Sequence, residues 1–233
     1  EAAKAWPDAL AIYKDVVGQI TDAEARKALL LRVARIQQAE LEDIGAAEAT
    51  YHELLALDAG DTIARVGLEE IKRLTGDSEG LVELLLQKVE TESSPESRAA
   101  VLREIAHIYE HKLESTESAF VAWIQVLTEM PRDERAAREV ERMAATPEQW
   151  QEAIAALTEA VAAPRDTADT IKLYLLMAGW YAGPLKRADI ALKCYAHVLK
   201  LQPLDEEAHQ GTVQLYRRSE SWAELVGLLE QRA

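Results

Sequence analysis

Apolar residues recur at steps of three and four positions along almost the whole chain, which is the spacing of one face of an α-helix. The run Ile105, Ile108, Tyr109 and Leu113 is typical. No segment alternates apolar and polar residues as a half-buried strand does. The pattern predicts an all-α protein of thirteen helices, near residues 7–19, 22–42, 46–57, 61–74, 78–91, 95–113, 116–129, 133–145, 147–162, 167–182, 187–200, 205–218 and 221–232.

The prolines support these boundaries. Ser94-Pro95 and Thr146-Pro147 each place a capping residue directly before a proline, a combination that is favoured at helix starts. Pro7 also lies near a predicted start, and the other four prolines fall between helical segments. We therefore expect no proline inside a helix, where it would cost about 3 kcal/mol.

The chain repeats itself with a period of 72 residues. The segment 103–133, two helices joined by a short polar turn, aligns without gaps with the segments 72 residues before and after it. Matched positions share size and polarity, as in the sets Ala34, Ala106, Ala178 and Tyr51, Trp123, Tyr195. A fixed period of this kind indicates a stacked array of equivalent units.

The period divides further into helical hairpins. The small or apolar residue that opens the second helix of each pair recurs at alternating intervals of 38 and 34 residues, at Ala9, Ala47, Leu81, Ala119, Ala153, Ala191 and Leu225. The longer interval holds four additional residues, in the segments near 91–94 and 162–165. Each hairpin exposes apolar residues on both flanks, and stacking against neighbouring hairpins would bury them.

Two hairpins carry a small residue, an aromatic residue four positions later and a proline eight positions after that: Ala119, Trp123, Pro131 and Ala191, Tyr195, Pro203. With the 34-residue unit, these residues make the chain similar to tetratricopeptide repeat (TPR) proteins. The resemblance implies an all-α, right-handed α-solenoid of about six antiparallel hairpins in one continuous domain, residues 1–233. It would comprise a half unit at 1–20 and double-hairpin repeats near 22–93, 94–165 and 166–233.

The resemblance also implies a function. TPR arrays are non-enzymatic scaffolds, so we expect a protein or peptide partner in a concave groove lined by the first helix of each hairpin, and no cofactor. A structural spacer within a larger assembly is the alternative that the repeats leave open.

Charge and composition narrow the choice of partner. The formal net charge of −15 disfavours nucleic acid and anionic membranes, because both attract a basic surface. No apolar run approaches the roughly 18 residues of a membrane span. The single cysteine, Cys194, excludes an internal disulfide, and its apolar neighbours predict that it is buried. The lack of a signal segment and the single cysteine favour the cytoplasm, and self-association is left open.

The first predicted helix lacks the partner that would complete its hairpin, and the last unit lacks the polar cap that solenoids normally carry. We therefore expect the sequence to be part of a longer array. The first helix should then expose an apolar face around Leu10, Ile12 and Val16, or cover it by association.

The 72-residue shift predicts which residues line the groove. Arg32, Glu104 and Leu176 should share one face, as should Ile36, Ile108 and Trp180, with His111 in the same groove. Arg135, Arg138 and Arg142 follow at i, i+3 and i+7 as a basic stripe in an acidic chain. This stripe is either a solvated face paired with Glu134, Glu139 and Glu141 or a clamp for an acidic or carboxylate-bearing peptide.

The helix near 167–182 is apolar around most of its circumference, and Lys172 is its only charge after residue 170. Such a helix is usually buried on all sides. We expect Leu173, Leu176 and Trp180 to point into the groove, covered by the opposite wall, by self-association or by a partner's apolar anchor. Trp beside Arg is typical of binding hot spots, which favours the partner.

The segment His107-Ile108-Tyr109-Glu110-His111 matches the inverted zinc-protease motif H-x-x-E-H. Two histidines four residues apart lie on one helix face, as metal ligation requires. A third ligand is not visible in the sequence, and alanines take the place of His107 in the sister repeats. We therefore predict a packing helix and no metal site here, with a zinc-dependent hydrolase as the minor alternative.

Overall fold

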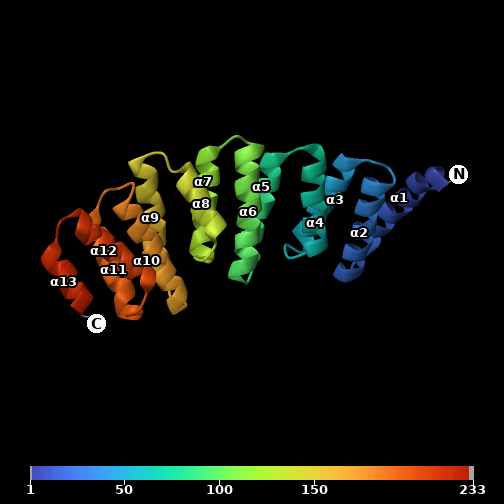
Figure 1. The fold of residues 1–233 in the computed structure, drawn as a ribbon. Coiled ribbons are helices and arrows are strands. Elements are labelled where there is room, and N and C mark those ends of the chain that lie inside the picture. Colours follow the sequence, from blue (N-terminus) through green and yellow to red (C-terminus); the bar gives the residue numbers. More distant parts are fainter. Residues whose placement is uncertain (1, 231–233) are drawn as a thin grey trace. The chain divides into compact units, whose positions relative to one another are not determined.

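The computed structural model describes residues 2–230, and that part of the chain is all α-helical, as predicted (Figure 1). The thirteen predicted helices are confirmed. They are α1 Ala2–Gln19, α2 Ala23–Ala39, α3 Ile44–Leu57, α4 Thr62–Thr75, α5 Ser78–Thr91, α6 Pro95–His111, α7 Thr116–Glu129, α8 Glu134–Met143, α9 Pro147–Ala162, α10 Thr167–Ala182, α11 Ala188–Leu201, α12 Glu206–Arg218 and α13 Trp222–Glu230.

Short polar side chains cap most helix starts. Ser94 accepts a hydrogen bond from the Ser97 backbone N–H, and Pro95 is the first helical residue, as predicted. Thr146 and Gln149 form a reciprocal capping box at the start of α9. Such caps satisfy backbone N–H groups that have no partner inside the helix, and each is worth about 1 kcal/mol.

Pro7 contradicts one expectation. It lies inside α1, which begins at Ala2 rather than near residue 7. As the sixth helical residue it lies beyond the first turn, so its missing N–H leaves the carbonyl group four residues earlier without its helical partner. Ile12 and Val16 of this helix are exposed and Leu10 is half-buried, so the predicted apolar face is largely open.

Three tight hairpins recur with the predicted period. α2 pairs with α3, α6 with α7, and α10 with α11. Each turn holds one residue with positive φ, namely Glu42, Glu114 and Lys186, at intervals of 72 residues. In each, the next residue donates its backbone N–H to a carbonyl six residues back, as from Ser115 to Tyr109 at 2.8 Å. The repeat therefore extends to individual backbone angles.

The chain separates into two compact units, residues 1–87 and 88–233, and the boundary falls within α5. In unit 1 the core is built from α1 to α4 and includes Ala47, Tyr51, Leu54 and Leu68. In unit 2 the largest fully buried side chains include Phe120 and Leu127. Cys194 is buried, as predicted. The single continuous domain and its repeat boundaries stay predictions.

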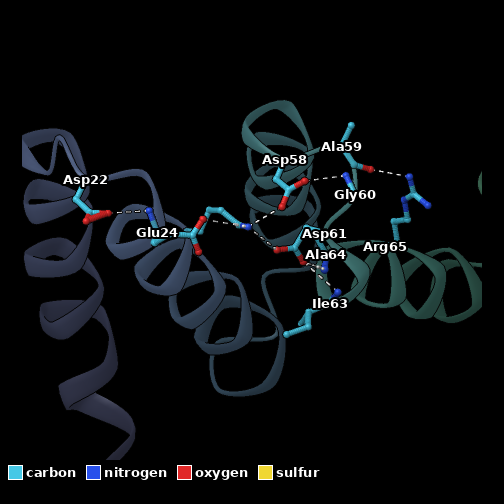
Figure 2. A network of polar contacts seen from close by, with 10 residues as sticks. Asp22, Glu24, Asp58, Ala59, Gly60, Asp61, Ile63, Ala64 and Arg65 are labelled. Carbon is cyan, nitrogen blue, oxygen red and sulfur yellow. Dashed lines mark hydrogen bonds and ion pairs between the residues drawn. The ribbon is translucent and has the colours of Figure 1, made fainter.

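Salt bridges join consecutive hairpins. In unit 1, Lys27 of α2 lies 2.6 Å from Asp58 and 3.7 Å from Asp61. Asp61 caps α4 by accepting hydrogen bonds from the backbone N–H groups of Ile63 and Ala64 (Figure 2). In unit 2, Arg103 of α6 bonds to Asp133, the cap of α8, at 2.6 Å. These contacts fix the start of each new hairpin against the first helix of the preceding hairpin. Within residues 2–230, no helix is long and apolar enough to cross a membrane.

Candidate functional site

The basic stripe of α8 faces α6. Arg142 bonds to Glu110 of α6 at 2.6 Å and to Glu139 of its own helix at 2.7 Å. These bonds raise the pKa of the Arg142 guanidinium, the pair with Glu139 contributing first. Arg142 thus fulfils the interpretation of a paired, solvated face, and it positions the stripe beside the H-x-x-E-H segment.

The other two arginines are more open. The Arg135 guanidinium lies over the ring of Trp123, 5.4 Å from its centroid, and the indole itself is buried. Arg138 is exposed, and among the described residues no side chain pairs with it. Cation–π contact holds Arg135 in place without neutralising its charge. Both guanidinium groups keep their hydrogen-bond donors available to a ligand.

His107 and His111 complete this surface, which we call the α6–α8 face: His107, Glu110, His111, Arg135, Arg138 and Arg142. The two imidazole rings are exposed and meet edge to face with centroids 4.3 Å apart. They flank Glu110 on α6 at helical spacing, opposite the arginines. The face therefore gathers three arginines and two histidines around one acidic residue, Glu110, in a chain of net charge −15.

The geometry around the H-x-x-E-H segment disfavours a metal ion. Glu110 is held by Arg142, whose fixed positive charge next to the two imidazoles disfavours a cation there. In the part of the chain that the structure describes, no group of three histidine, cysteine or acidic side chains is arranged to hold a metal ion.

Several predicted groove residues are buried instead. Ile36 is 5 % exposed, Ile108 6 %, Trp180 3 % and Leu173 0 %. The prediction that they line an open groove is therefore wrong for these four. The first helix of each hairpin packs against the preceding hairpin as well as against its own partner helix. Because the helix turns by about 100° per residue, neighbouring positions can lie one on the exposed side and one in the core.

Trp180 illustrates the cause. Its ring lies against Trp150 of α9, with centroids 5.4 Å apart, and its indole N–H donates to Glu141 of α8 at 3.0 Å. Leu176, one turn earlier, is half-buried. The apolar surface of α10 is therefore covered by the preceding hairpin of the same unit rather than left for a partner.

Unit 1 holds a hollow between α2 and α4, the two helices that correspond to α6 and α8 by the 72-residue period. Its volume is about 490 Å³. We call it the α2–α4 groove: Arg35, Gln38, Ala39, Ile44, Tyr51, Ile63, Val66, Gly67, Glu70 and Leu74. Its α2 wall begins at Arg35, not at Arg32 or Ile36. Arg32 is exposed but turns toward α1, over the ring of Tyr13.

No protein-family model and no curated protein sequence matches the chain. Solved structures do match, and many are TPR proteins. A TPR protein from Parabacteroides merdae is 13 % identical over 97 % of this chain and 85 % of its own, with a TM-score of 0.41. A thermophilic TPR protein from Thermus thermophilus is 21 % identical over 81 % of this chain and 98 % of its own, with a TM-score of 0.35. YrrB, described as a TPR protein with an unusual peptide-binding site, is 14 % identical over 86 % and 97 %, with a TM-score of 0.36.

The described residues form an all-α array of helical hairpins that repeats every 72 residues. Within this helical repeat, sequence reasoning missed four residues that lie on the exposed side of their helices: Arg35, His107, Ile63 and Val66. A signal was present, because Arg35 and His107 are polar residues 72 positions apart on helices whose neighbouring positions, Ile36 and Ile108, are apolar. A polar residue that recurs beside an apolar one marks the solvent edge of a helix.

Proposed function

We propose that the protein is a non-enzymatic interaction scaffold whose α6–α8 face captures an acidic, carboxylate-bearing segment of a partner protein. The observation that carries the proposal is the exposed pair Arg135 and Arg138, unneutralised beside two exposed histidines in a strongly acidic chain. Guanidinium groups bind carboxylates through two parallel hydrogen bonds, which gives geometric selectivity as well as affinity.

The three arginines of α8 have different roles in this proposal. Arg142 is held by Glu110 and Glu139 and supports the wall. Arg135 is oriented by the Trp123 ring, so less side-chain freedom is lost when it binds. Arg138 lies between them in the stripe and is the arginine that we expect to contact the ligand most directly.

The test is binding of a synthetic nine-residue peptide that carries four glutamates, with the glutamine version as control. We expect measurable binding of the glutamate peptide only, weakening as salt rises because exposed charge pairs are screened. Arg135→Glu with Arg138→Glu should weaken it at least tenfold, since each charge-assisted hydrogen bond is worth about 1.5–3 kcal/mol.

The matched control is Arg217→Glu with Arg218→Glu, which makes the same change of charge at two exposed arginines of α12. Equal losses in both double variants would reduce the effect to net charge and remove the α6–α8 face as the site. No binding by the unmodified protein would favour the spacer alternative. Zinc analysis of protein purified without a histidine tag tests the hydrolase alternative separately.

A further inference from the structure

α4 exposes large apolar side chains along one stripe of its surface. Ile63, Val66 and Leu74, at i, i+3 and i+11, are 45 %, 56 % and 66 % exposed. They line the α2–α4 groove together with Tyr51, whose ring is buried beneath them. Exposed apolar side chains that gather at a groove, rather than lie scattered, mark a contact surface.

The repeat provides two internal controls for this stripe. Positions 63 and 66 correspond to Arg135 and Arg138 in unit 2, and one further period on to Glu207 and Gln210. All four of these polar side chains are exposed. The same place in the fold thus accepts charged and polar residues, so folding does not require apolar ones at Ile63 and Val66. The apolar side chains of Ile63 and Val66 are therefore better suited to contact with another molecule than to the packing of unit 1.

The floor of the groove is rigid. A Cβ atom at Gly67 would lie 2.4 Å from the Tyr51 ring, so this ring packs directly against the α4 backbone. The Tyr51 hydroxyl donates to Gln38 at 3.1 Å, and Gln38 in turn donates to Glu70 at 3.1 Å. These bonds join both walls of the groove and leave its apolar stripe preformed.

Two charged side chains border the groove. Arg35, on the α2 wall, is exposed, and no ion pair to it is found among the described residues. Glu70, on α4, accepts a hydrogen bond from Gln38 and keeps its negative charge. The wall opposite the apolar stripe therefore offers an exposed guanidinium, which is complementary to an apolar face bordered by a carboxylate on the α2 side.

We propose that the α2–α4 groove binds an amphipathic helix of a partner protein, with its apolar stripe on Ile63, Val66 and Leu74 and an acidic residue at Arg35. The stripe follows the helical pattern i, i+3, i+11 and runs about 16 Å along α4 at 1.5 Å per residue. That length and pattern match a helix packed along α4, as in other helix-in-groove recognition.

This site is distinct from the α6–α8 face and goes beyond the proposed function. The probe is a synthetic 18-residue helical peptide with leucines on one face, glutamines on the other and a single glutamate at the border of the leucine face, labelled for fluorescence anisotropy. A peptide of the same composition with the leucines scrambled serves as its control. We expect binding of the amphipathic peptide and at least tenfold weaker binding of the scrambled one.

The decisive variant is Ile63→Glu with Val66→Gln, which installs the residues that α12 carries at these positions and is therefore compatible with the fold. It should weaken peptide binding at least tenfold, with the helical circular dichroism unchanged. Val226→Glu with Leu229→Gln, at two exposed apolar residues of α13 with the same spacing, is the matched control and should leave binding unchanged. Arg35→Ala should weaken binding about threefold.

Each other outcome overturns the proposal. Equal binding to the unmodified protein and the double variant would place the peptide elsewhere, and no binding to either would exclude this class of ligand. A sedimentation shift to dimers that the double variant abolishes would identify a second copy as the occupant. Arg138→Glu should leave this binding unchanged, so failure here is separable from failure at the α6–α8 face.

Discussion

Trp180→Ala tests whether this residue belongs to the core of unit 2 or to a ligand surface. The side chain is 3 % exposed and packs on Trp150. Truncating a buried Trp removes its apolar contacts and leaves a cavity, at a cost of about 3–5 kcal/mol. That is a large part of the 5–15 kcal/mol by which folded domains are typically stable. We therefore expect Trp180→Ala to lower the urea concentration at the midpoint of unfolding clearly, as monitored by circular dichroism.

Trp180→Phe separates packing from hydrogen bonding. Phenylalanine keeps an aromatic ring against Trp150 but removes the donor to Glu141, which should cost about 1 kcal/mol. In the Trp180→Phe background, Glu141→Gln should then change stability little, and the double-mutant cycle isolates the bond.

Trp222→Ala is the matched control. Trp222 lies 72 residues after Trp150, opens the equivalent helix and is 58 % exposed, so its loss should cost under about 1 kcal/mol. If Trp180→Ala also cost under about 1 kcal/mol, the assignment of Trp180 to the core would be refuted, and the side chain would belong to the exposed surface.

Two further predictions concern the backbone and acid stability. Gly67→Ala should destabilise unit 1 by about 1–3 kcal/mol because its methyl group would overlap the Tyr51 ring, whereas Gly179→Ala, with open space around it, should stabilise α10 by about 0.5–1 kcal/mol; thermal melts compare the two. The hydrogen bond from Lys27 lowers the pKa of Asp58 below its usual 3.8, so this bond stabilises the fold above that pH and is lost as pH falls through the lowered value. Asp58→Asn should therefore flatten the loss of stability below about pH 4, measured as urea midpoints against pH, and an unchanged slope would contradict this role.

The helices and their hairpin pairing follow from the sequence because a repeat states its pattern several times. An ambiguous segment such as 167–182 is resolved by its sister segments, and the caps at Ser94 and Thr146 are local signals. The residues that face outward are harder to predict. Ile108 and His107 differ by one position, and only the helix packed on the far side decides which of them is buried.

The α6–α8 face shows the same limit. The spacing of Arg135, Arg138 and Arg142 places them on one side of α8, which sequence alone predicts. Their differing states do not follow from spacing, because Glu110 and Trp123 lie on other helices and determine which guanidinium is paired, stacked or open. Trp180 was misplaced for a related reason, since its partner Trp150 belongs to the preceding hairpin.

The left-handed turn residues have a consequence for how such a chain can be lengthened or shortened. Glu42, Glu114 and Lys186 recur every 72 residues, in the turns of alternate hairpins. The turns of the other hairpins follow no single pattern, because Gly76 and Glu220 are left-handed whereas α9 starts at the cap Thr146 with a proline. Excising or inserting one hairpin would therefore place two hairpins of the same kind in succession. A genetic duplication or a designed graft keeps the alternation only when it moves two hairpins together, so the double hairpin is the module in which this array can be edited.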